Sequence, residues 1–222
     1  MTEEKKMLNG QIYDGSEDFL FKARLRAHKL CKQFSNEDED SPRRLELLEE
    51  IFPHHGRNLT ISGDLIVDYG TYTYWGDDCY ANFNLTILDT CPVNIGNRVF
   101  FGPNVSIYTP LHPFVPHERS FYVNDKGVVT DLEYGKPITI KDDCWICGSV
   151  TICAGVTIGK GCVIGAGSVV TRNIPDNSFA AGNPARVIKK ITSKDSILEK
   201  DIFANKEDIE RITKIIKEKE KM

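Results

Sequence analysis

An aliphatic residue returns at every sixth position over residues 140–170, and this period limits the possible folds more than any other feature. The series contains Ile140, Ile146, Ile152, Ile158, Ile164 and Val170. A second series, mostly small or β-branched, lies four residues after each member: Cys144, Val150, Val156, Cys162, Ser168 and Ile174. A period of six matches neither a helix nor a single strand. It predicts a hexapeptide-repeat parallel β-helix, in which each unit stacks one aliphatic residue on the neighbouring coil.

The repeat extends towards the N-terminus with two interruptions. The spacing holds at Ile61, Val67, Thr73, Cys79 and Leu85, slips near residues 89–94, and resumes at Ile95, Phe101 and Ile107. A long excursion loop follows at about residues 111–137. Because such a loop is costly to order on a compact solenoid, it is often functional.

Helices are expected before and after the solenoid in the sequence. The first follows Ser16, with the apolar stripe Phe19, Ala23, Ala27, Leu30 and Phe34. The second begins at Ser41-Pro42, with the stripe Leu45, Leu48 and Phe52. A third is expected near the C-terminus, with Ile202, Ile209, Ile212 and Ile216 on one face. The chain is therefore expected to comprise an N-terminal helical segment (1–58), a β-helix domain (59–190) and a C-terminal helical extension (191–222).

Composition excludes several classes of partner. The 222 residues include 28 Lys and Arg against 32 Asp and Glu, a formal net charge of −4. Because this balance gives no global positive field, neither nucleic acid nor an acidic membrane is expected as a partner. The sequence shows no apolar stretch of membrane-spanning length and no signal-peptide core at residues 1–10, so a cytoplasmic location is expected.

Seven cysteines raise the question of disulfides or a zinc site. Their number is odd, and several lie in or beside repeat positions, which favours reduced thiols packed in the core. Cys144 and Cys147 have the spacing of half a zinc site, but the repeat places them on different faces of the coil. No metal is therefore expected.

Longer strings of sequence carry a family resemblance. They are MLNGQIYDGSEDFLFKARLRAHKL, ANFNLTILDTCP, SIYTPLHPFVPHER, EYGKPITI, WICGSVTICAGVTIGKGCVIGAGSVVT and AGNPARVIKKI. Together they resemble the maltose and galactoside O-acetyltransferases, the maltose type most closely, over roughly residues 1–191. The resemblance implies a left-handed parallel β-helix with three hexapeptides per coil, assembled as a homotrimer with active sites between subunits. It also implies acetyl transfer from acetyl-coenzyme A to a sugar hydroxyl.

His112 is the expected general base. A hydroxyl that attacks a thioester must lose its proton, and an imidazole, whose pKa is about 6.5 in water, suits this task. His112 lies where the coil breaks into the excursion loop, and it matches the catalytic histidine of the family's T-x-x-H-P motif. The other histidines are expected to be structural or exposed: His28, His54, His55 and His117.

The resemblance also assigns the acceptor and cofactor sites. Arg24, Tyr80 and Asn82 match acceptor contacts; the family's aspartate falls near Gly15, and Asp14 stands one place earlier. Gly148 matches the backbone donor that stabilises the tetrahedral oxyanion, and Asn82 is expected to share in catalysis. The expected cofactor contacts are Trp145, Gly148, Ala166, Thr171, Arg172, Arg186 and Lys189. Cys147 departs from the glycine that the family commonly has there.

Three alternatives remain open. An acetyltransferase of this fold could use a non-sugar acceptor such as an antibiotic or serine, and a non-catalytic scaffold could keep the solenoid. A carbonic anhydrase would need three zinc-binding histidines, and no histidine follows His117. The joint presence of His112, Asn82 and the basic cluster argues against a non-catalytic scaffold, and the strings LDTCP and EYGKP make the maltose-type sugar enzymes the closer match.

Overall fold

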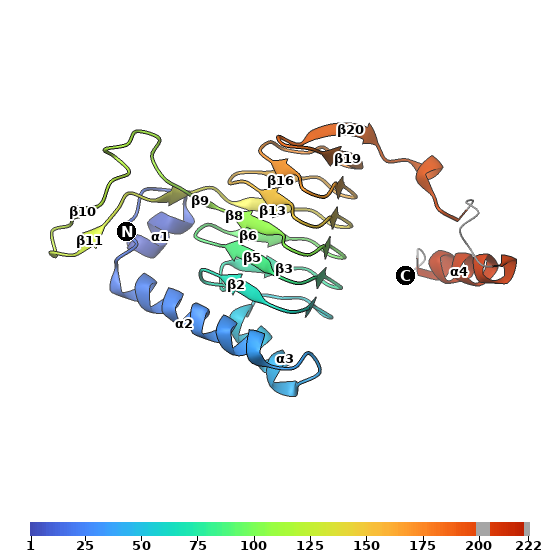
Figure 1. Ribbon diagram of the computed structural model, residues 1–222, viewed down its shortest axis with the longest axis horizontal. Coiled ribbons are helices and arrows are strands. Elements are labelled where there is room, and N and C mark those ends of the chain that lie inside the picture. Colours follow the sequence, from blue (N-terminus) through green and yellow to red (C-terminus); the bar gives the residue numbers. More distant parts are fainter. Residues whose placement is uncertain (199–204, 220–222) are drawn as a thin grey trace. The chain divides into compact units, whose positions relative to one another are not determined.

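The computed structural model describes residues 1–198 and 205–219. The chain forms two compact units, Met1–Lys189 and Lys190–Met222. The first unit is a parallel β-helix whose coils stack above N-terminal helices (Figure 1). The predicted mainly β solenoid of hexapeptide repeats is therefore confirmed.

Three sheets of short strands form the sides of the β-helix. The seven-stranded sheet has the order β1 (Thr60–Ile61), β4 (Tyr80–Ala81), β7 (Phe100–Phe101), β14 (Trp145–Ile146), β17 (Val163–Ile164), β19 (Ser178–Ala181) and β20 (Arg186–Lys190). The five-stranded sheet has the order β18 (Val169–Val170), β15 (Thr151–Ile152), β8 (Ser106–Tyr108), β5 (Leu85–Leu88) and β2 (Leu65–Val67). The four-stranded sheet has the order β16 (Thr157–Ile158), β13 (Ile138–Ile140), β6 (Val93–Ile95) and β3 (Thr73–Trp75).

The predicted inward series is confirmed between residues 140 and 174. Every member of the first series, from Ile140 to Val170, is at most 1% exposed, and the second series is also buried. Burying one such aliphatic side chain contributes about 1.5–3 kcal/mol. The core is therefore a column of aliphatic residues along the solenoid axis.

The predicted register of the early coils is wrong by two residues. The predicted inward residues of these coils are Thr73, Cys79 and Leu85. Strand pairing instead places Trp75, Ala81 and Ile87, each two residues later, on the core residues of the next coil, which are Ile95, Phe101 and Ile107. Partner residues are 20 positions apart here, whereas Ile146 and Ile164 are 18 apart. The extra residues lie at the corner between the five-stranded and four-stranded sheets.

A buried carboxylate organises this widened corner. Asp89 accepts hydrogen bonds from the N–H of Tyr69 (2.8 Å), the N–H of Tyr72 (3.2 Å) and the hydroxyl of Thr73 (3.1 Å). Burial raises the pKa of Asp89 to about 6 in spite of these bonds. The excursion loop leaves the third coil at the same corner, between β8 and β13. The irregular turns thus share one edge of the solenoid.

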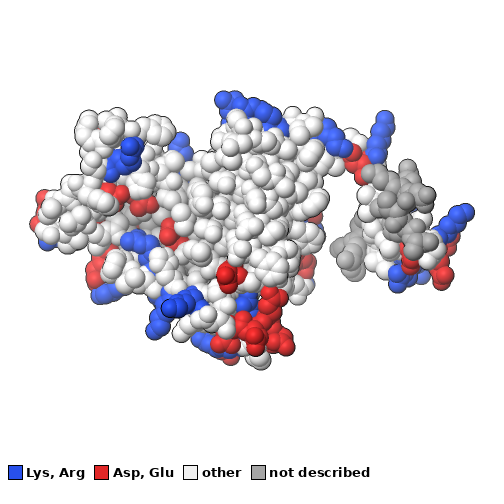
Figure 2. Space-filling model, in the orientation of Figure 1, with Lys and Arg blue, Asp and Glu red and all other residues white. Residues whose placement is uncertain are grey.

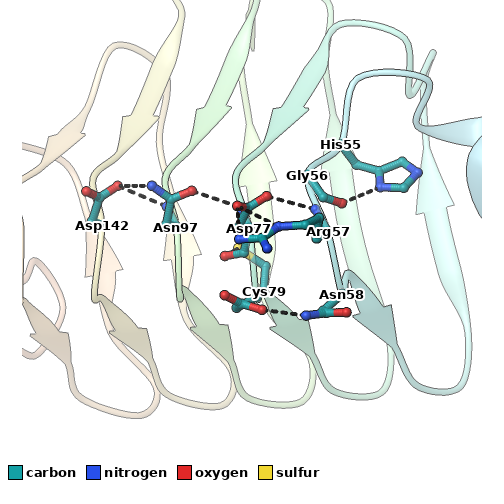
Figure 3. Close-up of polar contacts among 9 residues, drawn as sticks. His55, Gly56, Arg57, Asn58, Asp77, Cys79, Asn97 and Asp142 are labelled. Atoms are coloured by element: carbon teal, nitrogen blue, oxygen red, sulfur yellow. Dashed lines mark hydrogen bonds and ion pairs between the residues drawn. The ribbon is translucent and has the colours of Figure 1, made fainter. Parts of the chain in front are cut away.

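The corner between the four-stranded and seven-stranded sheets is regular and is joined by Asp and Asn side chains (Figure 3). The side chain of Asp77 accepts a hydrogen bond from the backbone N–H of Arg57 (2.8 Å). In the same way, the side chain of Asn97 accepts the N–H of Asp77 (2.8 Å), and the side chain of Asp142 accepts the N–H of Asn97 (2.9 Å). The residue that lies against each accepting oxygen is a glycine, because a Cβ atom there would collide with that oxygen. These glycines are Gly56, Gly76 and Gly96.

The excursion loop contains two pairs of antiparallel strands. β9 (Pro110–Leu111) pairs with β12 (Tyr134–Gly135) at its base, and β10 (Tyr122–Val123) pairs with β11 (Val129–Thr130) farther out. Figure 1 shows this outer hairpin extending away from the coils on the side where α1 (Glu3–Leu8) lies. The loop therefore lies beside the N-terminal segment.

The second unit contains a 3₁₀ turn, η1 (Ser193–Asp195), and the helix α4 (Lys206–Lys219). Ile209 and Ile212 are partly buried on α4, and Ile216 is exposed. The predicted Ile202 lies outside the described residues. Over the described ranges, every helix is too short or too polar to cross a membrane.

The helices α2 (Asp18–Asn36) and α3 (Pro42–Ile51) bury most of the residues predicted for their apolar stripes, including Ala27, Phe34 and Leu48. Phe19 and Leu45 are exposed, and Glu17 rather than Ser16 caps α2. The buried residues of α2 are Leu20, Ala27, Leu30, Cys31 and Phe34, and those of α3 are Arg44, Leu47, Leu48 and Ile51. The predicted stripes are therefore confirmed except at their first residues.

Arg44 joins the two helices to the first coil. Its guanidinium donates to the carbonyl oxygens of Phe34 (2.7 Å), Glu37 (2.9 Å), Ile61 (3.4 Å) and Gly63 (2.6 Å). The residue is 4% exposed, and its guanidinium carbon lies 3.8 Å from the centre of the Phe34 ring. One cation thus donates to two carbonyl groups at the end of α2 and to two carbonyl groups of the first coil.

We expect Arg44→Met to lower the free energy of unfolding by about 2–4 kcal/mol, because buried carbonyls lose their donors. Urea denaturation at a fixed protein concentration measures this loss. Arg43→Met is the matched control, because Arg43 forms only exposed ion pairs with Glu46 and Glu50, which are worth about 0–1 kcal/mol. Equal losses for the two variants would contradict the role assigned to Arg44.

Candidate active site

The structure places the predicted site residues in three groups. Arg24, Asp14 and His112 lie near the excursion loop. A second group lies on the seven-stranded sheet or just after its strands: Tyr80, Asn82, Trp145, Gly148 and Ala166. A third lies in the last coils: Thr171, Arg172, Arg186 and Lys189.

His112 is held through one ring nitrogen. Its Nδ1 lies 3.2 Å from the carbonyl oxygen of Leu132 and 3.2 Å from Oδ2 of Asp131. Both acceptors come from the strand segment that returns from the outer hairpin. The side chain is 45% exposed to solvent.

A cavity of about 360 Å³ lies between the start of α2 and the excursion loop. Its lining includes Arg24, Phe121, Asp131 and Glu133. Arg24 donates to the hydroxyl of Tyr69 (2.8 Å) and to the carbonyl of Gly15 (3.2 Å). The cavity thus combines one fixed cation, two carboxyl groups and an aromatic ring, which suits a small ligand with several hydroxyl groups.

Glu133 is the most buried acid of this cavity. Its backbone carbonyl accepts the N–H of Tyr13 (3.1 Å), which ties the loop to the N-terminal segment. Burial raises the pKa of the Glu133 carboxyl, although the nearby His112 opposes this shift. Burial likewise raises the pKa of Asp68, against the effects of Arg24 and His28.

Asp14 contacts the excursion loop. Its carboxylate accepts hydrogen bonds from Asn124 Nδ2 (2.7 Å), Thr130 Oγ1 (2.8 Å), Ser16 Oγ (2.6 Å) and Ser16 N (3.0 Å). Partial burial opposes ionisation, but these donors together lower the pKa of Asp14 to about 2. Because this value lies below the ordinary 3.8, the anchor is complete above about pH 4 and weakens as the pH falls towards 2.

Asn82 and Gly148 follow strands of the seven-stranded sheet at its corner with the five-stranded sheet. Asn82 Oδ1 accepts the N–H of Phe83 (2.8 Å), which leaves its amide nitrogen available as a donor. The Gly148 N–H donates to no group among residues 1–198 and 205–219. A Cβ atom on Gly102 would lie 2.5 Å from that nitrogen, so glycine at 102 keeps the donor accessible. A free backbone N–H of this kind can stabilise an oxyanion.

Within one chain, these donors and His112 lie on different edges of the solenoid. Gly148 and Asn82 precede strands of the five-stranded sheet, whereas His112 follows one of them. The width of that sheet, about six residues at 3.3 Å each, separates the two edges by about 15–20 Å. One subunit therefore does not bring the predicted base and the predicted oxyanion donors together.

The predicted cofactor contacts of the last coils are exposed. Thr171, Arg172, Arg186 and Lys189 are all accessible to solvent, and Trp145 is 53% exposed on the outer face of β14. All seven cysteines are free thiols. Within the described ranges, no group of His, Cys, Asp and Glu side chains has the arrangement of a metal site.

Sequence reasoning did not identify Asp131, Glu133 or Asn124 as site residues. Glu133 lies in the EYGKP string, which carries the family resemblance, and this signal could have identified it. Asp131 and Asn124 lie in the part of the loop where the resemblance gives no guidance. Only the folded loop brings them next to His112 and Asp14.

Two family models match the chain. The maltose acetyltransferase hexapeptide capping motif matches residues 6–56, and the bacterial transferase hexapeptide (six repeats) matches residues 137–172. The galactoside O-acetyltransferase of Escherichia coli K12 is 38% identical over 196 residues, 88% of this chain and 91% of that protein. The chain belongs to the maltose and galactoside O-acetyltransferase family. It is thus an O-acetyltransferase by descent.

Solved structures of the family agree with the fold. A maltose O-acetyltransferase from Clostridium difficile 630 has a TM-score of 0.78 and 41% identity, covering 87% of this chain and 99% of its own. A hexapeptide-repeat acetyltransferase from Vibrio cholerae, complexed with acetyl-coenzyme A, has a TM-score of 0.76 and 32% identity, covering 87% and 100%. The family fold therefore extends over the N-terminal helices as well as the repeat.

We expect Asp14→Ala to accelerate amide hydrogen exchange across residues 122–130 by about 10-fold or more, because the outer hairpin loses its anchor. Exchange at pH 7 followed by mass spectrometry measures this change. Asp18→Ala is the control, because Asp18 forms only an exposed ion pair with Lys22. Unchanged exchange in the Asp14 variant would show that other contacts hold the hairpin.

Proposed function

We propose that the chain transfers an acetyl group from acetyl-coenzyme A to a hydroxyl of a sugar of the maltose, glucose or galactoside type. The observation that carries this proposal is that His112 is held through Nδ1 by Asp131, which itself lines the cavity that contains Arg24 and Glu133. A histidine oriented in this way can accept a proton on Nε2. The family membership supports the acetyl transfer.

The cavity supports a sugar as the acceptor. A sugar presents several hydroxyl groups and one apolar ring face, and Arg24 with Glu133 offers a donor and acceptors for the hydroxyls. Phe121 and Phe21 line the same cavity and offer apolar faces. The N-terminal segment 1–58 is thereby proposed to form part of the acceptor site, with Arg24 as its contact. Asp14 is proposed to act on the acceptor through the loop that it anchors.

In the proposed reaction, the acceptor hydroxyl oxygen attacks the thioester carbonyl while His112 Nε2 takes the hydroxyl proton. The carbonyl oxygen becomes an oxyanion, which the Gly148 N–H and the Asn82 amide are proposed to stabilise. The carbon–sulfur bond then breaks, and the thiolate of coenzyme A takes the proton from His112. No covalent acyl-enzyme forms.

This chemistry requires donors from a second copy of the chain, and we propose a homotrimer with active sites between subunits. Outward residues of the five-stranded sheet are uncharged: Ile66, Thr86, Ser106, Thr151 and Val169. Those of the seven-stranded sheet are uncharged and partly aromatic from β1 to β19: Thr60, Tyr80, Phe100, Trp145, Val163 and Phe179. Only the terminal strand β20 exposes charged side chains, among them Arg186 and Lys190. Figure 2 shows few charged side chains on the coils in view. Such surfaces suit burial against another subunit.

The basic residues of the last coils are proposed to bind the phosphates of acetyl-coenzyme A. Arg172, Arg186 and Lys189 lie close in sequence at the end of an otherwise acidic chain, and an arginine can form paired hydrogen bonds with a phosphate. Trp145, Ala166 and Thr171 are proposed to line the pantetheine arm. A cytoplasmic location is also proposed, in keeping with seven free thiols.

We expect His112→Ala to reduce turnover by about 10²–10⁴-fold, the usual effect of removing a general base. Thiol release from acetyl-coenzyme A is measured with maltose, glucose, galactosides and serine as acceptors. Release that requires both a sugar and His112 supports the proposal. Release with serine alone would replace the sugar by an amino-acid acceptor, and normal turnover in a folded variant would remove His112 from the mechanism.

We expect coexpressed His112→Ala and Asn82→Ala chains, carrying different tags, to regain activity when they assemble together. If each site uses His112 of one subunit and Asn82 of the next, random mixing restores about one quarter of the sites, because each residue is intact with a probability of one half. Each variant alone should remain near background. Mixed assemblies that also remain at background would place both residues in the same subunit.

A further inference from the structure

We infer that Asp131 is a positioning residue that orients His112 and stabilises the imidazolium formed during acetyl transfer. The inference rests on the proposed function of His112. It extends that function to a residue of the excursion loop, which leaves the solenoid at the widened corner.

The geometry gives Nδ1 of His112 two acceptors. The Leu132 carbonyl oxygen and Asp131 Oδ2 both lie 3.2 Å from this nitrogen. An N–H on Nδ1 therefore points towards Asp131 and Leu132, which leaves the Nε2 lone pair as the base. The carbonyl alone could fix this tautomer. The carboxylate adds a negative charge, which stabilises the ring after Nε2 has taken the substrate proton, while Asp131 itself remains ionised.

The fold holds Asp131 in this position through the strand that precedes it. Asp131 directly follows β11, whose last residue, Thr130, is 5% exposed. The hydroxyl of Thr130 donates to Asp14 (2.8 Å), and the side chain of Asn124 donates to the same carboxylate (2.7 Å). The N-terminal segment therefore fixes the backbone that presents Asp131. The carboxylate is 29% exposed and lines the acceptor cavity.

Other charged groups face the same site and contribute to its pH dependence. Glu133 lies on the same segment and interacts with His112, Asp68 and Asp131. Arg24 on α2 lines the same cavity as Glu133, and the buried Tyr13 hydroxyl interacts with the Glu133 carboxyl. Glu133 and Asp68 remain in every variant proposed below. A difference between the pH profiles of wild type and an Asp131 variant is therefore attributable to Asp131.

The test compares the pH dependence of kcat in wild type, Asp131→Ala, Asp131→Asn and Asp131→Glu. Without the carboxylate, the imidazolium is less stable, so the acid limb of the kcat profile should move to lower pH by about one unit. At the plateau, kcat should fall by about 10-fold in the alanine variant, less than for loss of the base itself. The KM for acetyl-coenzyme A should change little, and Asp131→Glu should restore most of the wild-type profile.

Two controls separate this inference from the proposed function. Asp125→Ala removes an exposed carboxylate from the same loop and should leave kcat and its pH profile unchanged. If His112→Ala remains active, the proposed function fails. If His112→Ala is inactive but Asp131→Ala keeps the wild-type profile, only the role of Asp131 is overturned.

A second measurement does not depend on activity. ¹⁵N NMR of histidine-labelled protein reports the tautomer and the protonation midpoint of His112, whose signals are assigned by their loss in His112→Gln. Wild type should show the Nδ1–H tautomer, and Asp131→Ala should lower the midpoint pH by about one unit. An unchanged midpoint in that variant would overturn the inference.

Discussion

The stacking of one coil on the next is the interaction on which this protein depends. Each coil places an aliphatic side chain on the same axis as the coil below, from Ile61 and Ala81 to Ile164 and Ala180. Because buried side chains lock the register, the corners repeat at fixed positions. The corner between the four-stranded and seven-stranded sheets repeats closely and is joined by Asp and Asn side chains. The other corners are thereby free to carry irregular chemistry.

The widened corner positions the site. Two extra residues per coil create room for Asp89, and the third coil extends the same corner into the excursion loop. The loop then returns beside its own start and brings Asp131 and Leu132 to His112. A rigid solenoid thus supports a long loop whose ends are fixed by strand pairing, which is how a loop residue can be held precisely enough for catalysis.

Polar contacts join the N-terminal segment to the first coil of the solenoid and to the outer hairpin of the excursion loop. Arg44 binds carbonyl groups of the first coil, and Asp14 binds the outer hairpin. Each of these charged groups has several hydrogen-bond partners, so the contacts fix the orientation of the segments that they join. The donors of Gly148 and Asn82 remain on another edge, and this division is the physical reason for proposing a site shared between subunits.

The sequence by itself determined the solenoid, the excursion loop and the family, because a six-residue period and family motifs are local signals. It did not determine the register of the early coils, because the two added residues form no recognisable turn motif and their place depends on the buried Asp89. It identified His112 from its motif, but not Asp131 or Asn124. Those residues meet His112 and Asp14 across separations of 19 and 110 positions, and only tertiary packing decides which distant side chains lie next to one another.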